Sequence, residues 1–75
     1  MFNGYKKANL ILNKNCIGNL YNLRLKYRNY KFKAETLYCL LININNTAAT
    51  FLAEGSTTIF DLNDKDIILY AKKIS

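Results

Sequence analysis

The clearest pattern in the chain is an alternation of apolar and polar residues that starts at position 21. The odd positions hold large apolar side chains, namely Tyr21, Leu23, Leu25 and Tyr27. The even positions hold polar or basic side chains, namely Asn22, Arg24, Lys26 and Arg28. Because successive side chains of a β-strand point to opposite faces, this period of two predicts a half-buried strand. We expect Leu23 and Leu25 to face the core and the three cations to face solvent.

The apolar positions change from odd to even numbers around Arg28 and Asn29. A one-residue change of phase indicates a turn or a bulge. The even phase then continues from position 30 to position 44, which is long for one strand of a small domain, so we expect a break within 33–36. Residues 34–42 also fit a helical stripe, but their β-branched and aromatic side chains favour a strand.

Clusters of Asn, Gly and Asp separate the remaining segments, as is typical of turns. We expect further strands at 5–12, 49–53, 57–62 and 67–74. The connections expected between them are a two-residue turn at 18–19, a tight turn at 54–56, and polar turns at 45–47 and 63–66.

Five to six short strands predict an all-β fold, a small antiparallel barrel or sandwich, with a β-rich α+β fold as the alternative. The segment 57–74, a strand, a polar turn and a strand, resembles the closing element of an SH3-like barrel. This resemblance makes the SH3-like barrel the favoured architecture.

The length of 75 residues predicts one small domain, 1–75, and a hydrophobic content of 51% is sufficient for its core. The chain has no His, which excludes a Ser-His-Asp triad and a His-ligated metal. Asp61, Asp64 and Asp66 form an acidic cluster, but they lack the Gly and the later Glu of a calcium-binding loop, so they predict a polar turn. We therefore predict a protein that is not an enzyme and has no catalytic residue, metal or cofactor.

The longest apolar run, 37–42, is too short to cross a membrane as a helix, and the first residues do not resemble a signal peptide. We expect a cytoplasmic protein that does not bind a membrane. Its cysteines are then free thiols, with Cys39 buried in the apolar run and Cys16 in a polar turn. Asn, Lys, Ile, Tyr and Phe, all written with AT-rich codons, make up 38 of the 75 residues. This bias indicates a low-GC genome, either that of a bacterium or that of a phage or mobile element acting in the cytoplasm of its host.

Basic charge is concentrated in the first part of the chain. Residues 1–33 contain eight Lys and Arg and no acid, whereas residues 34–75 contain three Lys and five acids. The candidate binding residues are the cations of the alternating segment and those just after it, with one interleaved aromatic: Arg24, Lys26, Arg28, Lys31, Lys33 and Tyr30. Cations at alternate strand positions are about 6–7 Å apart, a spacing comparable to that of phosphates along a nucleic-acid strand. An adjacent Tyr can stack on a base.

This surface predicts a small basic protein that binds nucleic acid. The alternative is an acidic protein surface as the partner, with the chain acting as an inhibitor or adaptor of the anti-defence type, encoded by a phage or mobile element. The last predicted strand, 67–74, carries no charge before Lys72. If it lies at a sheet edge, it predicts a homodimer through that edge.

Overall fold

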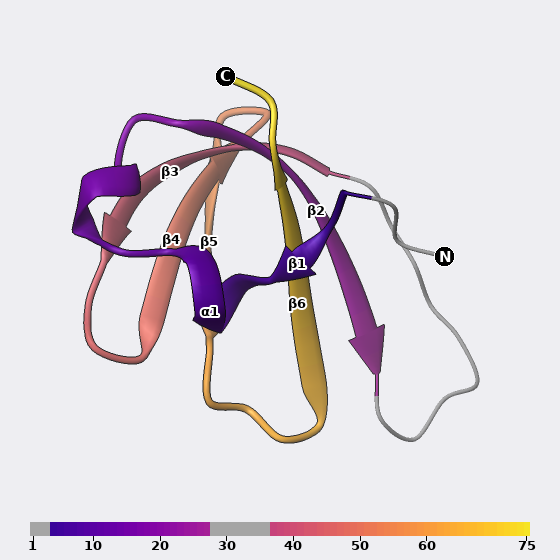
Figure 1. Cartoon of the computed structure of the whole chain (residues 1–75). Helices are drawn as coiled ribbons and strands as arrows, with labels where there is room; N and C mark the ends of the chain where they lie inside the picture. Colours follow the sequence, from indigo (N-terminus) through magenta and orange to yellow (C-terminus); the bar gives the residue numbers. More distant parts are fainter. Residues whose placement is uncertain (1–3, 28–36) are drawn as a thin grey trace.

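The computed structural model describes residues 4–27 and 37–75 (Figure 1). The described residues form one six-stranded antiparallel sheet and two short helical segments. In chain order the elements are β1 (Lys6–Lys7), α1 (Ala8–Ile11), the 3₁₀ helix η1 (Lys14–Cys16), β2 (Leu20–Tyr27), β3 (Leu37–Ile44), β4 (Ala48–Ala53), β5 (Ser56–Asp61) and β6 (Ile67–Lys73). The predicted small antiparallel all-β class is confirmed.

The strands lie in the order β1-β6-β2-β3-β4-β5. Strands β2 to β5 follow one another, and β6 returns to the far side of β2. In a flat sheet β5 and β6 would be about 19 Å apart, which is nearly the full reach of the link 62–66. That link is folded into a turn, so the sheet must curl to bring the two strands together, as Figure 1 shows. Within the described residues the edge strands β1 and β5 do not pair, so the sheet is curled but not closed.

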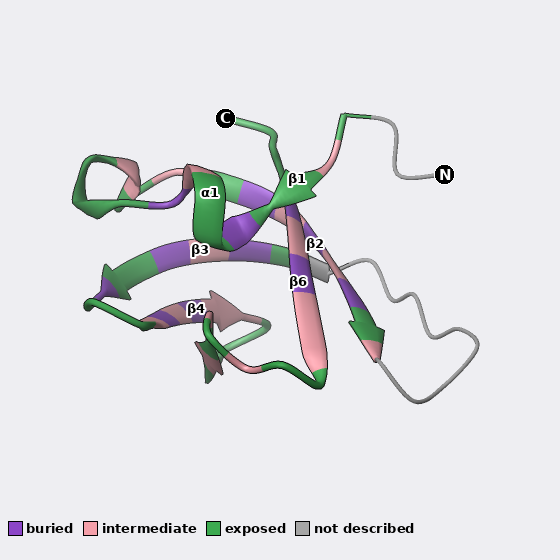
Figure 2. Cartoon of the chain, turned by 60° about the horizontal axis from the view of Figure 1, so that its bottom comes forward, coloured by how far each residue is buried: buried purple, intermediate pink, exposed green. Residues whose placement is uncertain are grey.

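The core lies on the concave face of the curled sheet. Its three largest fully buried side chains are Phe51, Leu23 and Leu41. Phe51 packs edge-on against Tyr21, with ring centroids 6.4 Å apart, and against Phe60, at 5.9 Å. The helical segments cover part of this face, since α1 contacts β6 and η1 contacts β3. Figure 2 shows buried and more exposed positions in succession along β2, β3 and β6.

Strand β2 follows its sequence pattern. Leu23 and Leu25 are buried, whereas Arg24 is half-buried and Lys26 is exposed. The predicted phase change at 28–29 and the break within 33–36 lie outside the described residues. Strand β3 confirms the strand expected from 37 onwards.

The burial of β3 corrects the expected even phase. Cys39 and Leu41 point into the core, whereas Tyr38 and Ile42 are exposed. A register shift between Leu41 and Asn43 then turns Ile44 inward. Both phases of this segment are apolar, so its pattern does not define a buried face, and pairing with β2 and β4 does.

The strand expected at 5–12 is wrong for most of its length. Only Lys6 and Lys7 form a strand, β1, which pairs with β6, and the chain then turns into α1. Ala8 and Leu12 are four residues apart, so one turn of helix places both on the same side, where both are buried. A strand would have placed these two side chains about 13 Å apart.

The turn expected at 18–19 lies one residue earlier, with Ile17 and Gly18 at its centre, because the Asn19 N–H donates to the carbonyl of Cys16 at 3.0 Å. It does not close a hairpin between adjacent strands. Gly18 has φ +97° and donates to the carbonyl of Leu41, and the Leu41 N–H donates to the carbonyl of Asn19. These bonds extend the pairing of β2 with β3.

The other predicted turns are present. Glu54 and Gly55, with φ of 52° and 80°, form the two-residue connection between β4 and β5. The acidic cluster forms a polar turn, because Asp61 Oδ1 accepts from the Asn63 N–H at 2.9 Å and Asp64 Oδ1 accepts from the Asp66 N–H at 2.8 Å.

The last strand is not the edge on which the dimer prediction rested. Strand β6 lies between β2 and β1, with β1 covering Tyr70 and Ala71. The long edge belongs to β5, which pairs only with β4 among the described strands. None of the described helices has the length and apolar character that crossing a membrane requires.

Candidate nucleic-acid interface

The hydrogen-bond register of the sheet defines rows of side chains across its convex outer face. Directly opposed residues of antiparallel strands point to the same side and lie within contact range. Arg24 on β2 opposes Tyr70 on β6, and Tyr70 opposes Lys7 on β1. Lys26 opposes Ile68 in the next row. Strands β1 and β2, on either side of β6, therefore place Lys7, Arg24 and Lys26 on one face.

A further row lies on the other side of Arg24. Asn22 on β2 is flanked by Lys72 on β6 and by Tyr38 on β3. We refer to the cations of these rows, Lys7, Arg24, Lys26 and Lys72, as the basic patch. The described positions of the three rows hold no Asp or Glu.

Tyr5 lies over the middle of the basic patch. The Arg24 guanidinium carbon is 5.5 Å from the centre of its ring, and Lys72 Nζ is 5.9 Å from it. Both distances fall within the range in which a cation is attracted to an aromatic face. The preceding Gly4 has φ +78°, a backbone conformation that favours glycine, and the Lys72 side chain lies against it, with Cε 3.2 Å from where a Cβ would be. Tyr5 thereby holds two cations of the patch together despite their like charge.

Beyond the Asn22 row the outer face becomes apolar. Leu20 opposes Leu40, and Leu40 opposes Leu52 on β4. Leu20 and Ile74 remain 41% and 43% exposed. With Tyr38 at its edge, this row lines an open hollow of about 440 Å³. The outer face therefore combines a cationic half and an apolar half, joined at Asn22.

The structure brings together only part of the set predicted from the sequence. Arg24 and Lys26 share the outer face of β2, as the alternation requires. Arg28, Tyr30, Lys31 and Lys33 lie outside the described residues, and their binding role stays a prediction.

Sequence reasoning missed Lys7, Lys72, Tyr5 and Tyr38. Lys72 and Tyr38 belong to strands distant in the chain from β2, and no local pattern connects them to it. Tyr5 was placed in a longer strand that the structure replaces with β1 and α1.

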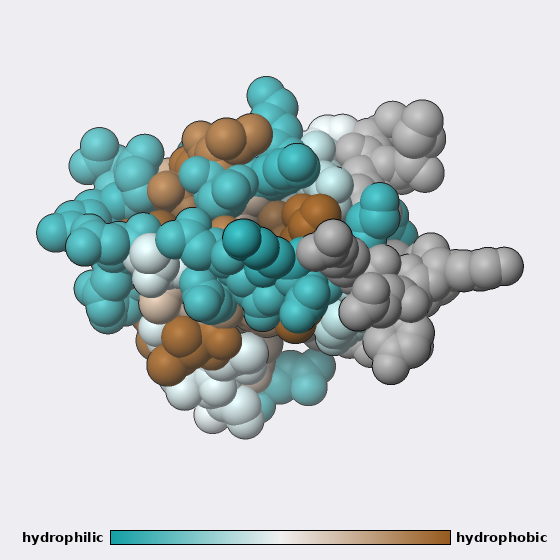
Figure 3. Space-filling model, turned by 90° about the horizontal axis from the view of Figure 1, so that it is seen from below, coloured by the Kyte–Doolittle hydropathy of each residue, from teal (hydrophilic) through white to brown (hydrophobic). Residues whose placement is uncertain are grey.

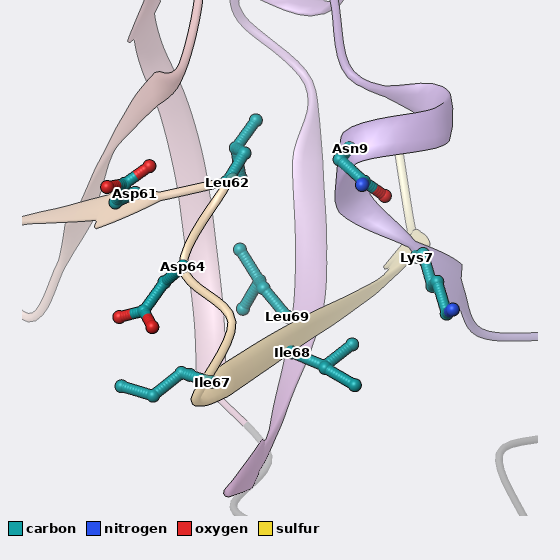
Figure 4. A pocket seen from close by; sticks show the side chains of 8 residues that line it. All are labelled: Lys7, Asn9, Asp61, Leu62, Asp64, Ile67, Ile68 and Leu69. Atoms are coloured by element: carbon teal, nitrogen blue, oxygen red, sulfur yellow. The ribbon is translucent and has the colours of Figure 1, made fainter. Parts of the chain in front are cut away.

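Charge of the opposite sign lies across a pocket from Lys7, at one end of the basic patch. A small pocket of about 100 Å³ lies beside the β5–β6 turn, with Asp61 and Asp64 on one side and Lys7 on the other (Figure 4). Both Asp side chains already accept hydrogen bonds from the backbone of the turn.

Seen from below, hydrophilic side chains cover most of the described surface, and hydrophobic ones form separate patches (Figure 3). Within the described ranges no group of three His, Cys, Asp or Glu side chains could hold a metal ion.

The two cysteines are free thiols in different surroundings. Cys39 is buried, as predicted, and burial raises the pKa of its thiol. Cys16 is half-buried, and its thiol donates to the carbonyl of Ile11 at 3.5 Å. The raised pKa of Cys39 favours the neutral thiol, which is the unreactive form.

The outer face is thus the part of the described surface where cations and aromatic rings from separate strands converge. Comparison of the chain with protein-family models, with curated proteins and with solved structures finds no match.

Proposed function

We propose that the protein binds nucleic acid through the basic patch on the outer face of β1, β6 and β2, without catalysing a reaction. The observation that carries the proposal is the convergence of Lys7, Arg24, Lys26 and Lys72, from three strands, on rows that hold no acid. Phosphates bound there would release condensed counterions, which is the main source of affinity in non-specific nucleic-acid binding. The patch would act in the cytoplasm, where the predicted location puts the protein.

The residues that follow β2 in the chain extend this proposal. Arg28, Lys31 and Lys33 add three cations directly after Lys26 and Tyr27. If they continue the patch, the bound strand would run past the end of β2, with Tyr30 available for stacking.

The test is a salt titration of binding to a fluorescent single-stranded oligonucleotide, measured by anisotropy. Each phosphate contact on a single strand contributes about 0.7 to the slope of log affinity against log salt. The double variant Lys26→Gln, Lys72→Gln should therefore lower the slope by about 1.4. The matched control is Lys14→Gln, Lys65→Gln, which removes the same charge from exposed positions in η1 and in the β5–β6 turn. Equal slopes for the two double variants would contradict a localised site, and absence of binding would contradict the function.

A second candidate function rests on the exposed apolar row. Leu20, Leu40 and Ile74 beside a basic patch would suit an acidic protein with an apolar anchor, as expected for an inhibitor or adaptor from a phage or mobile element. Such an interface should depend on salt less than phosphate binding does. A pull-down from a low-GC bacterial lysate, with and without nuclease, separates the two candidates. A partner retained after nuclease treatment supports the protein interface.

A further inference from the structure

The row Lys72–Asn22–Tyr38 contains an exposed aromatic ring at the boundary between the cationic and apolar halves of the outer face. The Tyr38 side chain is 71% exposed, the largest exposed fraction among the described aromatic residues. A ring in this position contributes little to the core. Its faces are available for stacking, and bases stack on such rings whatever their sequence.

The centre of the same row holds a polar atom without a hydrogen bond. Asn22 Oδ1 is buried and accepts no hydrogen bond within the described part of the chain. A buried acceptor without a donor lowers stability, and such atoms are uncommon in proteins. Its cross-strand neighbours Lys72 and Tyr38 are both exposed side chains, so the row that contains this oxygen borders solvent on both sides of Asn22. The N–H groups on the edge of a base are donors that could satisfy it.

The hollow beside Tyr38 provides the space for a base. It is lined by Leu20, Leu40 and Ile74 and is larger than the lower limit for small-molecule sites. Glu54 is the acidic residue among those that line the hollow, and its side chain is exposed. Its charge repels phosphate, so a bound strand would place its backbone on the opposite side, over Lys72 and Arg24.

We propose that Tyr38 and Asn22 form a base-binding site that selects single-stranded over double-stranded nucleic acid. The inference rests on the proposed function of the basic patch. The backbone would follow the cations of β2 and β6, one base would stack on Tyr38 over the apolar row, and its edge would donate to Asn22 Oδ1. In a duplex the bases remain paired and stacked, so they cannot reach Tyr38.

The experiment compares binding of a 15-nucleotide single strand and a duplex of the same length, at several salt concentrations. Tyr38→Ala should weaken single-strand binding by about 5- to 150-fold, the range that loss of one stacked base produces, and should leave duplex binding unchanged. The slope of affinity against salt should not change, because no phosphate contact is removed. The matched control Tyr38→Phe keeps the ring and should bind like the unmodified chain.

The variant Asn22→Leu provides a second, independent readout. It replaces the unpartnered acceptor with an apolar group of similar size, so the midpoint of urea denaturation should stay the same or rise. Single-strand binding should nevertheless weaken. Improved stability combined with reduced affinity is a result that a merely structural Asn22 would not give. Unchanged affinity in this variant would overturn the role of Asn22.

The outcomes separate this inference from the function on which it rests. If neither oligonucleotide binds, the proposed function itself is wrong. If both bind equally and Tyr38→Ala changes neither affinity, the basic patch stands and the base-binding site is refuted. If poly-glutamate binds as tightly as the single strand and is equally weakened by Tyr38→Ala, the row serves an acidic protein partner, and the inference is also overturned.

Discussion

Phe51 is the position at which one substitution should report most directly on the core. Its side chain is completely buried, and its ring packs edge-on against Tyr21 and Phe60 from neighbouring parts of the curled sheet. Phe51→Ala would remove about 3–5 kcal/mol, which approaches the total stability of roughly 4–11 kcal/mol expected for a chain of this length. The conservative variant Phe51→Leu is therefore the better perturbation, because the protein should remain folded.

The expected effect of Phe51→Leu follows from its two ring contacts. Each edge-to-face pair contributes about 0.5–1.5 kcal/mol beyond the area it buries, so loss of both should lower the free energy of unfolding by about 1–3 kcal/mol. Phe60 is half-buried and pairs with Phe51 at an interplanar angle of 66°. Phe60→Leu removes one of the two pairs and should cost about half as much.

The assay is equilibrium denaturation in urea, followed by circular dichroism. For a small protein the free energy changes by about 1 kcal/mol per molar urea, so the Phe51→Leu midpoint should fall by about 1–3 M with an unchanged slope. Ile59→Val is the surface control, since Ile59 is 68% exposed on β5 and its truncation should cost less than about 0.5 kcal/mol. If Phe51→Leu shifts the midpoint no more than Ile59→Val does, Phe51 is not the centre of the core and the strand pairing around it is incorrect.

Two further predictions concern the β4–β5 turn and alkaline pH. Glu54 and Gly55 both have positive φ, a geometry that favours Asn-Gly, so Glu54→Asn should raise the free energy of unfolding by a few tenths of a kcal/mol, whereas Gly55→Ala should lower it by about 1–2 kcal/mol. Thermal unfolding measures both changes, and the reverse order would contradict the assigned turn. Burial raises the pKa of Tyr21 and of Cys39 in the folded protein, so each ionises more readily in the unfolded chain. The stability they contribute should be fully present below the ordinary thiol pKa of about 8.5 and should decrease as the pH rises through 10. Urea denaturation at pH 8 and pH 10.5 tests this, and equal stability at the two values would refute it.

The sequence by itself determined the faces of β2. Because the alternation is strict, only one register of the strand buries Leu23 and Leu25 and keeps Lys26 in solvent. A shift of the register by one residue would expose the two leucines and bury the lysine. The turns at 45–47, 54–55 and 63–66 were also predictable, since Asn, Asp and Gly tolerate the backbone conformations that turns require. These features depend on residues close together in the chain, and a local pattern is sufficient to define them.

Tertiary structure decided the features that depend on pairing between distant segments. Both phases of β3 are apolar, so only its position between β2 and β4 put Cys39 inside and Tyr38 outside. The return of β6 to β2 placed Lys72 beside Asn22, fifty positions earlier in the chain. A strand with a strict alternation, such as β2, encodes its own two faces, but its neighbours depend on which long-range pairing buries the most apolar surface. The candidate interface crosses three strands in this way, and for that reason the sequence predicted its cations on β2 but not the residues that complete it.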